Sequence, residues 1–323
     1  MTSGGSLGRM KTSRTRFSLT PTLSRSTGRG SFSSKPGTRV GYLAGGVEDP
    51  IIPASRRPLT DSEITHLMPD FKTTCEDAAR AGGAVLLDWA GRFAVREKGP
   101  ADLVTEADFA SQQVIRERLL SAFPDHGFVG EENGEDIRPE AAYRWIVDPL
   151  DGTTNYVHQL PQYSVSVALE HEGRIIAGTV FDPVADECFS AARGQGAFLN
   201  GRRLIVSRVR ELPQALVAAS FPACVRRDAQ EIKDFIEVLL VAQAVRRMGS
   251  SALNLCYVAA GRFDAYWATE TKTWDVAAGF LMIEEAGGVI SNLQGAPYDL
   301  RKPRFVAAAN EALQQQIIGV LGQ

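Results

Sequence analysis

The sequence predicts an α+β fold in which layers of helices and sheets are stacked on one another. Between residues 71 and 321, strand-like runs and pairs of segments with helical spacing alternate twice along the chain. Hydrophobic residues make up 44% of the 323 residues, which is enough for a substantial core. Charged residues make up 23%, and with this hydrophobic content they exclude global disorder.

The first half of this pattern begins with two helices. Apolar residues recur at helical spacing over residues 71–93. A second helix is expected over residues 105–123, because Thr105 can cap its start and Pro124 ends it. Strands are expected over residues 128–130, 143–147, 163–170, 174–181 and 187–199. Tight turns are expected at residues 172–173 and 200–201.

The second half contains short strands between helices. Strands are expected over residues 216–220, 289–291 and 305–308, and helices over residues 230–245, 250–260, 275–286 and 310–321. Gly261 and Gly287 follow two of these helices as C-caps would. We therefore expect one folded region over residues 68–323, with an N-terminal half to about residue 215 and a C-terminal half from residue 216.

The N-terminal segment differs in composition from this folded region. Residues 1–47 contain eight Lys and Arg residues and no Asp or Glu, so residues 48–323 hold 27 bases and 38 acids, a charge of −11. The segment is rich in Ser, Thr and Gly and shows no helical or strand period. It is predicted to be disordered, because it buries too little apolar surface to offset its ordering entropy. Residues 48–67 are interpreted as a linker, which makes residues 1–67 an extension outside the fold.

Three interpretations of this basic segment stay open: an organelle transit peptide, a tail that contacts nucleic acid, or an upstream extension of a protein translated from Met68. The acidic remainder is poorly suited to holding a polyphosphate backbone by charge, so no nucleic-acid partner is expected for it. We find no apolar run long enough to cross a membrane. The four cysteines are widely spaced, which favours a reducing compartment such as the cytoplasm over a disulfide scaffold.

The strongest candidate for a catalytic or metal-binding site is the segment DPLDGTTN at residues 148–155, which follows a strongly apolar strand. Asp148 and Asp151 can point into one space from this turn, where each carboxylate raises the pKa of the other unless a cation lies between them. Oxygen ligands without His or Cys favour Mg²⁺ or a similar ion. Alone, this motif is also typical of an ordinary acidic turn, and it does not match the calcium loop of an EF-hand.

Further acids stand at the ends of strands or the starts of helices. Glu131 and Glu132 follow one short strand, Asp102 opens the second helix, and Asp275 opens a later one. Each could be a solvated turn residue or a helix cap. Four such positions in one chain favour a shared site.

These segments resemble the inositol monophosphatase family of Mg²⁺-dependent, lithium-sensitive phosphatases. The resemblance runs from about residue 71 to 321 and is carried by residues 145–155 and 274–288, with residues 102–108 and 130–133 in the family's order and spacing. It implies a layered α-β-α-β-α sandwich of the sugar-phosphatase type. It also implies a homodimer that acts on a small phosphorylated polyol or sugar.

The resemblance implies two to three Mg²⁺ ions. Glu131, Asp148 and the carbonyl of Leu150 would hold the first ion, and Asp148, Asp151 and Asp275 the second. A third, weaker ion would lie near Glu131. One ion would lower the pKa of a bound water, and another would stabilise the leaving group.

The remaining roles are implied in the same way. Asp102 and Thr153 would form the catalytic pair that orients or deprotonates the attacking water, with Glu132 supporting the ligands. The implied substrate contacts are Gly152, Thr153, Gly249, Ser250, Ser251 and Asp275. The backbone N–H groups of Gly152 and Thr153 would face the phosphate.

One position departs from the family pattern. Seven residues before Asp275, family members that act on inositol usually carry an acid that binds a substrate hydroxyl, whereas this chain has Ala268; Glu270 stands two residues on. We expect hydrolysis of inositol 1-phosphate, with histidinol phosphate, fructose 1,6-bisphosphate and 3′-phosphoadenosine 5′-phosphate as alternatives. The interpretation from a different class is a non-catalytic, Mg²⁺-dependent regulatory or binding protein.

Overall fold

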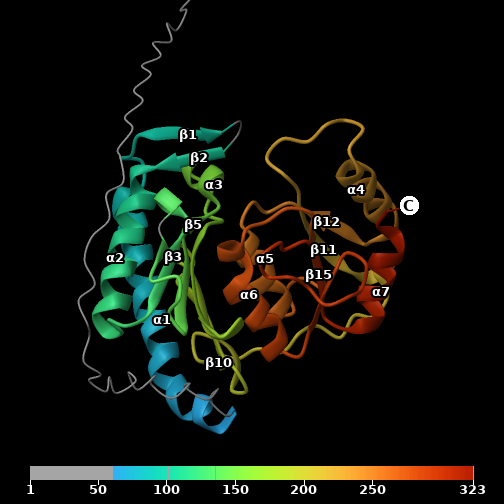
Figure 1. The fold of residues 1–323 in the computed structure, drawn as a ribbon. Helices are drawn as coiled ribbons and strands as arrows, with labels where there is room; N and C mark the ends of the chain where they lie inside the picture. The colour runs from blue at the N-terminus through green and yellow to red at the C-terminus, as the bar shows by residue number, and fades with distance from the viewer. Residues whose placement is uncertain (1–60, 100–101, 135, 323) are drawn as a thin grey trace, which may run out of the picture. The chain divides into compact units, whose positions relative to one another are not determined.

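The computed structural model describes residues 61–99, 102–134 and 136–322 (Figure 1). The predicted disorder of residues 1–47, and the linker as far as residue 60, lie outside this range. Two large sheets dominate what is described, and the strand order of the larger is β10-β9-β8-β7-β6-β5-β3-β4. Its strands are β3 (Gly127–Gly130), β4 (Asp136–Ile137), β5 (Tyr143–Asp151), β6 (Ser164–His171), β7 (Arg174–Asp182), β8 (Glu187–Ala192), β9 (Gly196–Leu199) and β10 (Arg202–Arg203).

The smaller sheet has five strands in the order β12-β11-β13-β15-β14. They are β11 (Leu216–Ser220), β12 (Ala244–Arg246), β13 (Ala265–Ala268), β14 (Val289–Asn292) and β15 (Phe305–Ala308). Strand β11 runs parallel to both of its neighbours, β12 and β13, whereas β15 is antiparallel to β13 and β14. A separate hairpin pairs β1 (Val95–Gly99) with β2 (Asp102–Thr105).

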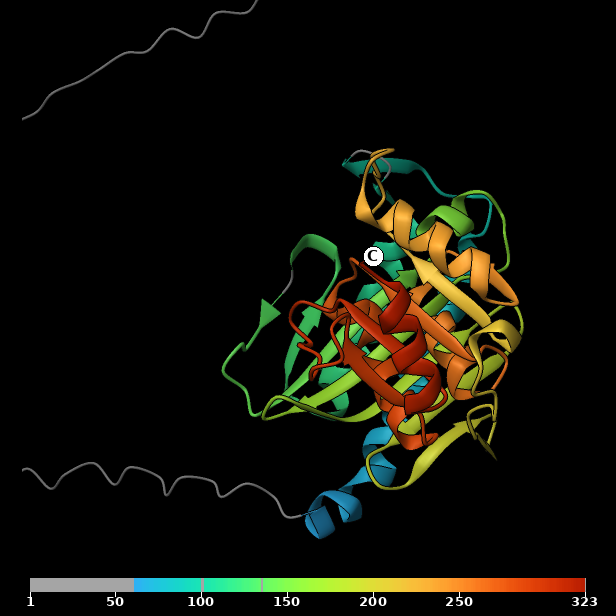
Figure 2. The same ribbon diagram turned by 90° about the vertical axis from the view of Figure 1, so that its right-hand side faces the viewer.

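Helices separate and cover the two large sheets. They are α1 (Asp61–Trp89), α2 (Glu106–Ala122), α3 (Thr153–Val157), α4 (Gln230–Val241), α5 (Ser251–Ala259), α6 (Thr273–Glu285) and α7 (Glu311–Val320). Helices α1 and α2 cover one face of the eight-stranded sheet, and α5 and α6 fill the space between the sheets (Figure 1). Helices α4 and α7 lie on the outer side of the five-stranded sheet, the side that faces the viewer in Figure 2. The predicted α-β-α-β-α sandwich is confirmed.

The middle layer packs closely against the larger sheet. Gly178 in β7 faces α6, and a Cβ atom built there would lie only 3.0 Å from the Cα of Ala278. Such a contact is tighter than normal packing allows, so the glycine permits the close approach of helix and sheet. Helix α6 carries Asp275 in its first turn, and this packing therefore sets the position of a predicted site residue.

The structure corrects several predicted boundaries. Helix α1 begins at Asp61, so residues 61–67 are helical and do not belong to a linker. Residues 102–105 form a strand, whereas the sequence placed them at the start of a helix, because they pair with residues 95–99. The single strand expected over residues 187–199 is two strands joined by a turn. The helix expected over residues 230–245 ends at Val241, after which the chain pairs with β11.

No helix within the described ranges is both long enough and apolar enough to cross a membrane.

A buried histidine makes the stability of the fold sensitive to acid. His126 is 9% exposed and stacks between Phe123 and Tyr143, with ring centroids 4.7 and 4.9 Å away. Burial lowers the pKa of His126 to about 4, although the charge of Asp125 opposes the shift. The unfolded chain titrates near pH 6.5. The neutral ring therefore stabilises the fold fully above that pH, and this stability is lost as the pH falls through 4.

We expect His126→Phe to flatten the fall in melting temperature between pH 7 and pH 4.5, measured by differential scanning calorimetry. The exposed His158 supplies the matched control, His158→Phe, whose profile should follow the wild type. Parallel profiles for the wild type and His126→Phe would contradict this origin of the acid sensitivity.

Candidate active site

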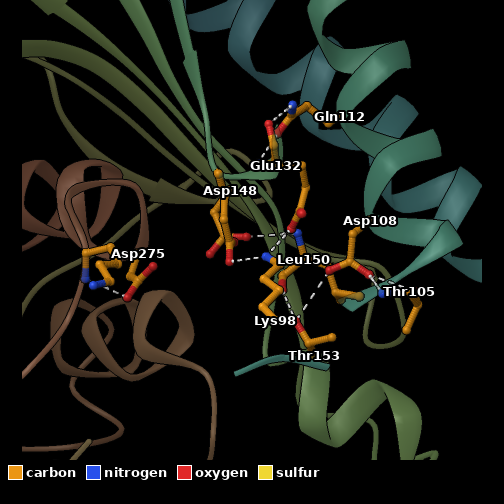
Figure 3. Close-up of polar contacts among 11 residues, drawn as sticks. Lys98, Thr105, Asp108, Gln112, Glu132, Asp148, Leu150, Thr153 and Asp275 are labelled. Atoms are coloured by element: carbon orange, nitrogen blue, oxygen red, sulfur yellow. Dashed lines mark hydrogen bonds and ion pairs between the residues drawn. The ribbon is translucent and has the colours of Figure 1, made fainter. Parts of the chain in front are cut away.

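The site is built around the end of β5, where the ladder with β6 is interrupted. The register with β6 shifts between Asp148 and Asp151, so the strand is irregular where both acids lie. They are 2% and 7% exposed, respectively. The Oδ1 atom of Asp148 accepts a hydrogen bond of 2.9 Å from the N–H of Leu150 (Figure 3). The backbone at the irregular end of β5 thus holds the Asp148 carboxylate in place before any ligand binds.

Asp151 is bound to the start of helix α5. Its carboxylate accepts hydrogen bonds from the hydroxyl of Ser250, from the N–H of Ser251 at 3.1 Å and from the N–H of Ala252 at 2.8 Å. The Ser250 hydroxyl also caps α5 by accepting from the N–H of Leu253. An acid at this end of a helix is stabilised by the helix dipole and by the otherwise unpaired N–H groups.

Residues predicted to contact substrate therefore surround Asp151. Gly249 has φ +87°, and a Cβ atom there would lie 2.7 Å from the amide nitrogen of Asn155. Ser250 is fully buried and bonded to Asp151, so its hydroxyl is engaged within the protein. The role of Gly249, Ser250 and Ser251 as substrate contacts stays a prediction.

The anchoring of α5 gives Asp151 a structural role as well. Asp151→Asn presents an amide group where the carboxylate accepts three hydrogen bonds, so at least one donor loses its partner. We expect the free energy of unfolding to fall by about 1–3 kcal/mol.

The measurement is urea denaturation in the presence of EDTA. Asp186→Asn is the matched control, because the Asp186 side chain is exposed and forms a surface ion pair with Arg80 at 3.0 Å. An unchanged denaturation midpoint for Asp151→Asn would show that these contacts contribute little to stability.

The hydroxyl of Thr153, at the start of α3, lies against a buried acid of helix α2. Thr153 Oγ1 is 3.4 Å from Oδ1 of Asp108 and 3.1 Å from the carbonyl oxygen of Leu150 (Figure 3). The other Asp108 oxygen accepts from the N–H of Thr105 at 2.9 Å and from its hydroxyl at 2.6 Å. Asp108 is 1% exposed, and burial raises its pKa to about 6 although the Thr105 bonds lower it.

The structure brings Asp108, which the sequence did not assign to the site, to the hydroxyl of Thr153. The expected pairing of Asp102 with Thr153 stays a prediction. Asp102 begins β2, and its side chain lies outside the described part of the chain. The sequence does show Asp108, but as an acid in the first turn of a helix, a position that capping alone explains. Asp108 does form a capping box with Thr105. Because this local role explains the acid by itself, the sequence gives no sign of its contact with Thr153.

A lysine that the sequence did not single out lies on the other side of the site. The ammonium group of Lys98 is 2.9 Å from Glu131 and 2.6 Å from Glu132. Burial alone would lower the pKa of Lys98, but the two glutamates raise it above its usual value. Burial raises the pKa of Glu132 to about 7. The backbone of Glu132 is fixed by Gln112, which accepts from its N–H at 2.9 Å and donates to its carbonyl oxygen at 3.1 Å.

Asp275 comes from the middle layer. It lies in the first turn of α6, whose N-cap is Lys272, and its carboxylate accepts a hydrogen bond of 2.8 Å from the N–H of Lys272. Burial raises its pKa, and the charge of Asp151 adds to the shift. Burial likewise raises the pKa of Asp148 well above the usual range, with the charges of Glu131, Asp151 and Asp275 adding to it.

These carboxylates fit a hard cation by their chemistry. All their donors are oxygens, which Mg²⁺ prefers, and the charges of Glu131, Asp151 and Asp275 oppose ionisation of Asp148. Within the described ranges, no three His, Cys, Asp or Glu side chains are grouped closely enough to hold an ion as they stand. The ammonium group of Lys98 supplies the positive charge at Glu131 and Glu132. The electrostatics thus favour a cation at Asp148.

Comparison with known proteins agrees with this picture. The profile of the inositol monophosphatase family matches residues 67–323. The chain is 47% identical over 226 residues to an inositol-1-monophosphatase of Rhizobium meliloti (strain 1021), which covers 69% of this chain and 84% of the relative. It is 43% identical over 241 residues to a Nus factor SuhB of Pseudomonas aeruginosa, which covers 71% of this chain and 88% of the relative.

Solved structures show the same architecture. The extragenic suppressor protein suhB from Bartonella henselae superposes with a TM-score of 0.75 at 38% identity, covering 79% of this chain and 99% of that one. An inositol monophosphatase from Anabaena superposes with a TM-score of 0.71 at 36% identity, covering 78% of this chain and 95% of that one.

Proposed function

Because the chain belongs to the inositol monophosphatase family, whose members are generally metal-dependent phosphatases, we propose that it is a Mg²⁺-dependent phosphomonoesterase that hydrolyses inositol 1-phosphate to inositol and inorganic phosphate. The observation that carries this proposal is the Asp108–Thr153 contact beside buried acids at the end of β5. A hydroxyl next to a buried carboxylate can accept a hydrogen bond from water and pass on its proton.

Glu131, Asp148, Asp151, Asp275 and the Leu150 carbonyl are the groups that would hold Mg²⁺ in this proposal. A bound ion would lower the pKa of a water molecule and neutralise charge on the phosphate. The Leu150 carbonyl oxygen lies 3.1 Å from Thr153 Oγ1 and is the alternative acceptor for its single hydroxyl hydrogen. Thr153 would therefore link the metal ligands to the groups that handle water.

Asp108 would receive the proton in this scheme. Thr153 Oγ1 can donate to Asp108 while its lone pair accepts from the attacking water. The pKa of Asp108, raised to about 6, leaves the carboxylate ionised at neutral pH but more basic than an exposed aspartate. Water would attack the phosphorus directly, and the alcohol of the substrate would leave with a proton from solvent.

The turn between β5 and α3 would face the phosphate. Gly152 has φ +99°, which favours glycine, and no side chain caps α3. The N–H groups of Gly152 and Thr153 would bind phosphate oxygens there, as the resemblance implies. A Cβ atom on residue 152 would approach the carbonyl oxygen of Gln162 to 3.0 Å, so substitution would disturb this turn.

The proposal is tested by phosphate release from inositol 1-phosphate, histidinol phosphate, fructose 1,6-bisphosphate and 3′-phosphoadenosine 5′-phosphate, each with Mg²⁺, with EDTA and with added Li⁺. We expect turnover that requires Mg²⁺ and is inhibited by Li⁺. No release from any of these substrates, or release that EDTA leaves unchanged, would overturn the proposal.

Millimolar Mg²⁺ is also expected to raise the melting temperature, and the rise should grow with Mg²⁺ concentration because the ion binds the folded state preferentially. A non-catalytic Mg²⁺-dependent protein would show this stabilisation without phosphate release. Because several relatives are named Nus factor SuhB, stabilisation by Mg²⁺ and phosphate release are measured on the same protein sample.

A cytoplasmic homodimer is proposed in addition, on the resemblance and the cysteine pattern given above. Analytical ultracentrifugation of the full chain measures its oligomeric state, and a single species at the monomer mass would contradict the dimer.

A further inference from the structure

A cluster of three hydroxyl groups lies where the five-stranded sheet meets helix α5. The hydroxyl of Tyr266, in β13, is 2.8 Å from Oγ of Ser220 and 3.1 Å from Oγ of Ser251. Ser220 ends β11 and Ser251 begins α5, so the three residues come from three different elements. Tyr266 is fully buried, whereas both serines are partly exposed. The buried tyrosine therefore contacts two serines that solvent reaches in part.

The ring of Tyr266 is fixed within the core. It packs edge-on against Phe305 of β15, with the ring centroids 5.2 Å apart. Burial raises the pKa of the Tyr266 hydroxyl to about 12, although its bonds to Ser220 and Ser251 lower it. The hydroxyl therefore keeps its proton at neutral pH. A buried tyrosine whose hydroxyl reaches polar partners combines core packing with a fixed polar group.

The single hydrogen of the Tyr266 hydroxyl gives this cluster a direction. A tyrosine or serine hydroxyl donates one hydrogen bond and can accept others. For both contacts to be hydrogen bonds, Tyr266 donates to one serine and accepts from the other. The serine that receives the hydrogen keeps its own hydrogen to donate, and the serine that donates keeps lone pairs to accept. Together the two serines offer one donor and one acceptor, which match the two capacities of a substrate hydroxyl.

The cluster lies beside the groups of the proposed active site. The N–H of Ser251 donates to the carboxylate of Asp151 at 3.1 Å, and the hydroxyl of the preceding Ser250 bonds to the same carboxylate. The charge of Asp151 also contributes to the raised pKa of Tyr266. The hydroxyl of Ser251 is therefore connected to a proposed metal ligand within a single residue.

The cluster also adjoins the position at which the chain departs from its family. Strands β11 and β13 run parallel, and Ser220 pairs with Ala268. Side chains alternate along a strand, so Tyr266 and Ala268 point to the same side of the sheet, and both belong to the core that α5 and α6 cover. Ala268 offers no polar side chain where members that act on inositol usually carry an acid. The hydroxyl cluster supplies polar groups next to this position.

We propose that Tyr266 is a positioning residue: it orients the hydroxyls of Ser220 and Ser251 so that they bind a hydroxyl of the alcohol that leaves the phosphate. This inference rests on the proposed phosphatase activity and deepens it. It makes a leaving group that carries hydroxyls, as a polyol or sugar does, the substrate class that this side of the site recognises. Tyr266 would act through the serines without touching the substrate, and its effect would be on binding.

The kinetic test compares two phosphate monoesters, inositol 1-phosphate and 4-nitrophenyl phosphate, whose ring carries no hydroxyl group. Tyr266→Phe keeps the ring and removes its hydroxyl. We expect KM for inositol 1-phosphate to rise about three- to tenfold, the range for one lost hydrogen bond, while kcat changes less than about twofold. For 4-nitrophenyl phosphate, both KM and kcat should stay within about twofold of the wild type.

Two further comparisons separate orientation from packing. Tyr298→Phe is the matched control, because the Tyr298 hydroxyl donates to Glu284 at 3.0 Å near the far end of α6, and KM should stay unchanged for both esters. In the Ser220→Ala/Ser251→Ala background, adding Tyr266→Phe should raise KM no further, since the tyrosine acts through these serines. An equal rise of KM for both esters, an unchanged KM for inositol 1-phosphate, or a further rise in the serine background would overturn the positioning role.

A binding measurement separates this proposal from the phosphatase activity. Calorimetric titration of Asp108→Asn with inositol 1-phosphate in Mg²⁺ measures Kd while turnover is slow, and adding Tyr266→Phe should raise Kd by the same factor as KM. A raised Kd in a protein that releases no phosphate from any ester would retain the positioning role and refute the phosphatase proposal. Turnover of inositol 1-phosphate with equal Kd in the two forms would do the reverse. Absence of binding in both forms would overturn the positioning role.

Discussion

Replacing Asp148 by Asn is expected to abolish Mg²⁺-dependent phosphate release, with kcat/KM falling by about 10³-fold or more. Asp148 is 2% exposed and interacts electrostatically with Glu131, Asp151 and Asp275. Its neutralisation would remove one of the negative charges that the proposed Mg²⁺ site relies on. The measurement is phosphate release over a series of Mg²⁺ concentrations, so that weakened metal binding and lost turnover are both detected.

The same substitution should not destabilise the protein when Mg²⁺ is absent. Asparagine keeps an oxygen that can accept the N–H of Leu150, at 2.9 Å in the wild type. It also removes a buried negative charge that the charges of Glu131, Asp151 and Asp275 repel. We expect the melting temperature of Asp148→Asn in EDTA to equal or exceed that of the wild type, and the rise caused by Mg²⁺ to disappear.

Asp182 offers a matched control elsewhere in the same sheet. It is 3% exposed and accepts two backbone hydrogen bonds of 2.9 Å, from the N–H groups of Val184 and Ala185. Asp182→Asn is expected to retain both turnover and the stabilisation by Mg²⁺. Wild-type turnover of Asp148→Asn, or equal losses in the two variants, would refute the proposed metal site.

Asp108→Asn is expected to lower kcat by about 10²–10⁴-fold with little change in KM, as the loss of a general base would. If the amide oxygen keeps the Thr105 contacts, the NH₂ group faces Thr153 and cannot accept its proton. The capping box would survive, so the variant should fold normally. Steady-state kinetics with inositol 1-phosphate and a melting curve measure the two effects separately.

Comparison with Asp102→Asn decides between the assignment from sequence and the assignment from structure. If Asp108 receives the proton from Thr153, Asp102→Asn should keep kcat within a few-fold of the wild type, because this substitution leaves the Asp108–Thr153 contact in place. The opposite ranking of the two variants would restore the assignment of Asp102. A selective rise in KM for Asp108→Asn would instead indicate that Asp108 binds substrate and takes no part in proton transfer.

Regular elements with a clear pattern could be predicted from the sequence. The strands at Leu216–Ser220 and Phe305–Ala308 have the expected bounds, because each is a short apolar run between clear breaks. Helix α5 begins after Ser250, which caps it. Strand β12 could not be predicted, since three residues after a helix have no period of their own. They become a strand by pairing with β11.

In the site, too, residues that share one segment could be predicted from the sequence, whereas contacts between separate elements could not. Asp148 and Asp151 are recognisable because two acids stand close together after an apolar strand. Asp108 forms a local capping box, and its contact with Thr153 depends on how α2 packs beside β5. Lys98 has no motif around it and reaches Glu132 only because the β1–β2 hairpin lies next to the site. Contacts between elements cannot be predicted from spacing along one segment.

The hydrogen bonds between Asp151 and the start of α5 join residues 99 to 101 positions apart in the chain. A chain growing on the ribosome exposes the acids of β5 well before the residues that fix Asp151 have been made. Asp275 follows later still. We therefore expect nascent chains that stop before α6 to have no phosphatase activity even where β5 and β6 have paired, so that the onset of activity would report that the middle helical layer has been synthesised and has docked.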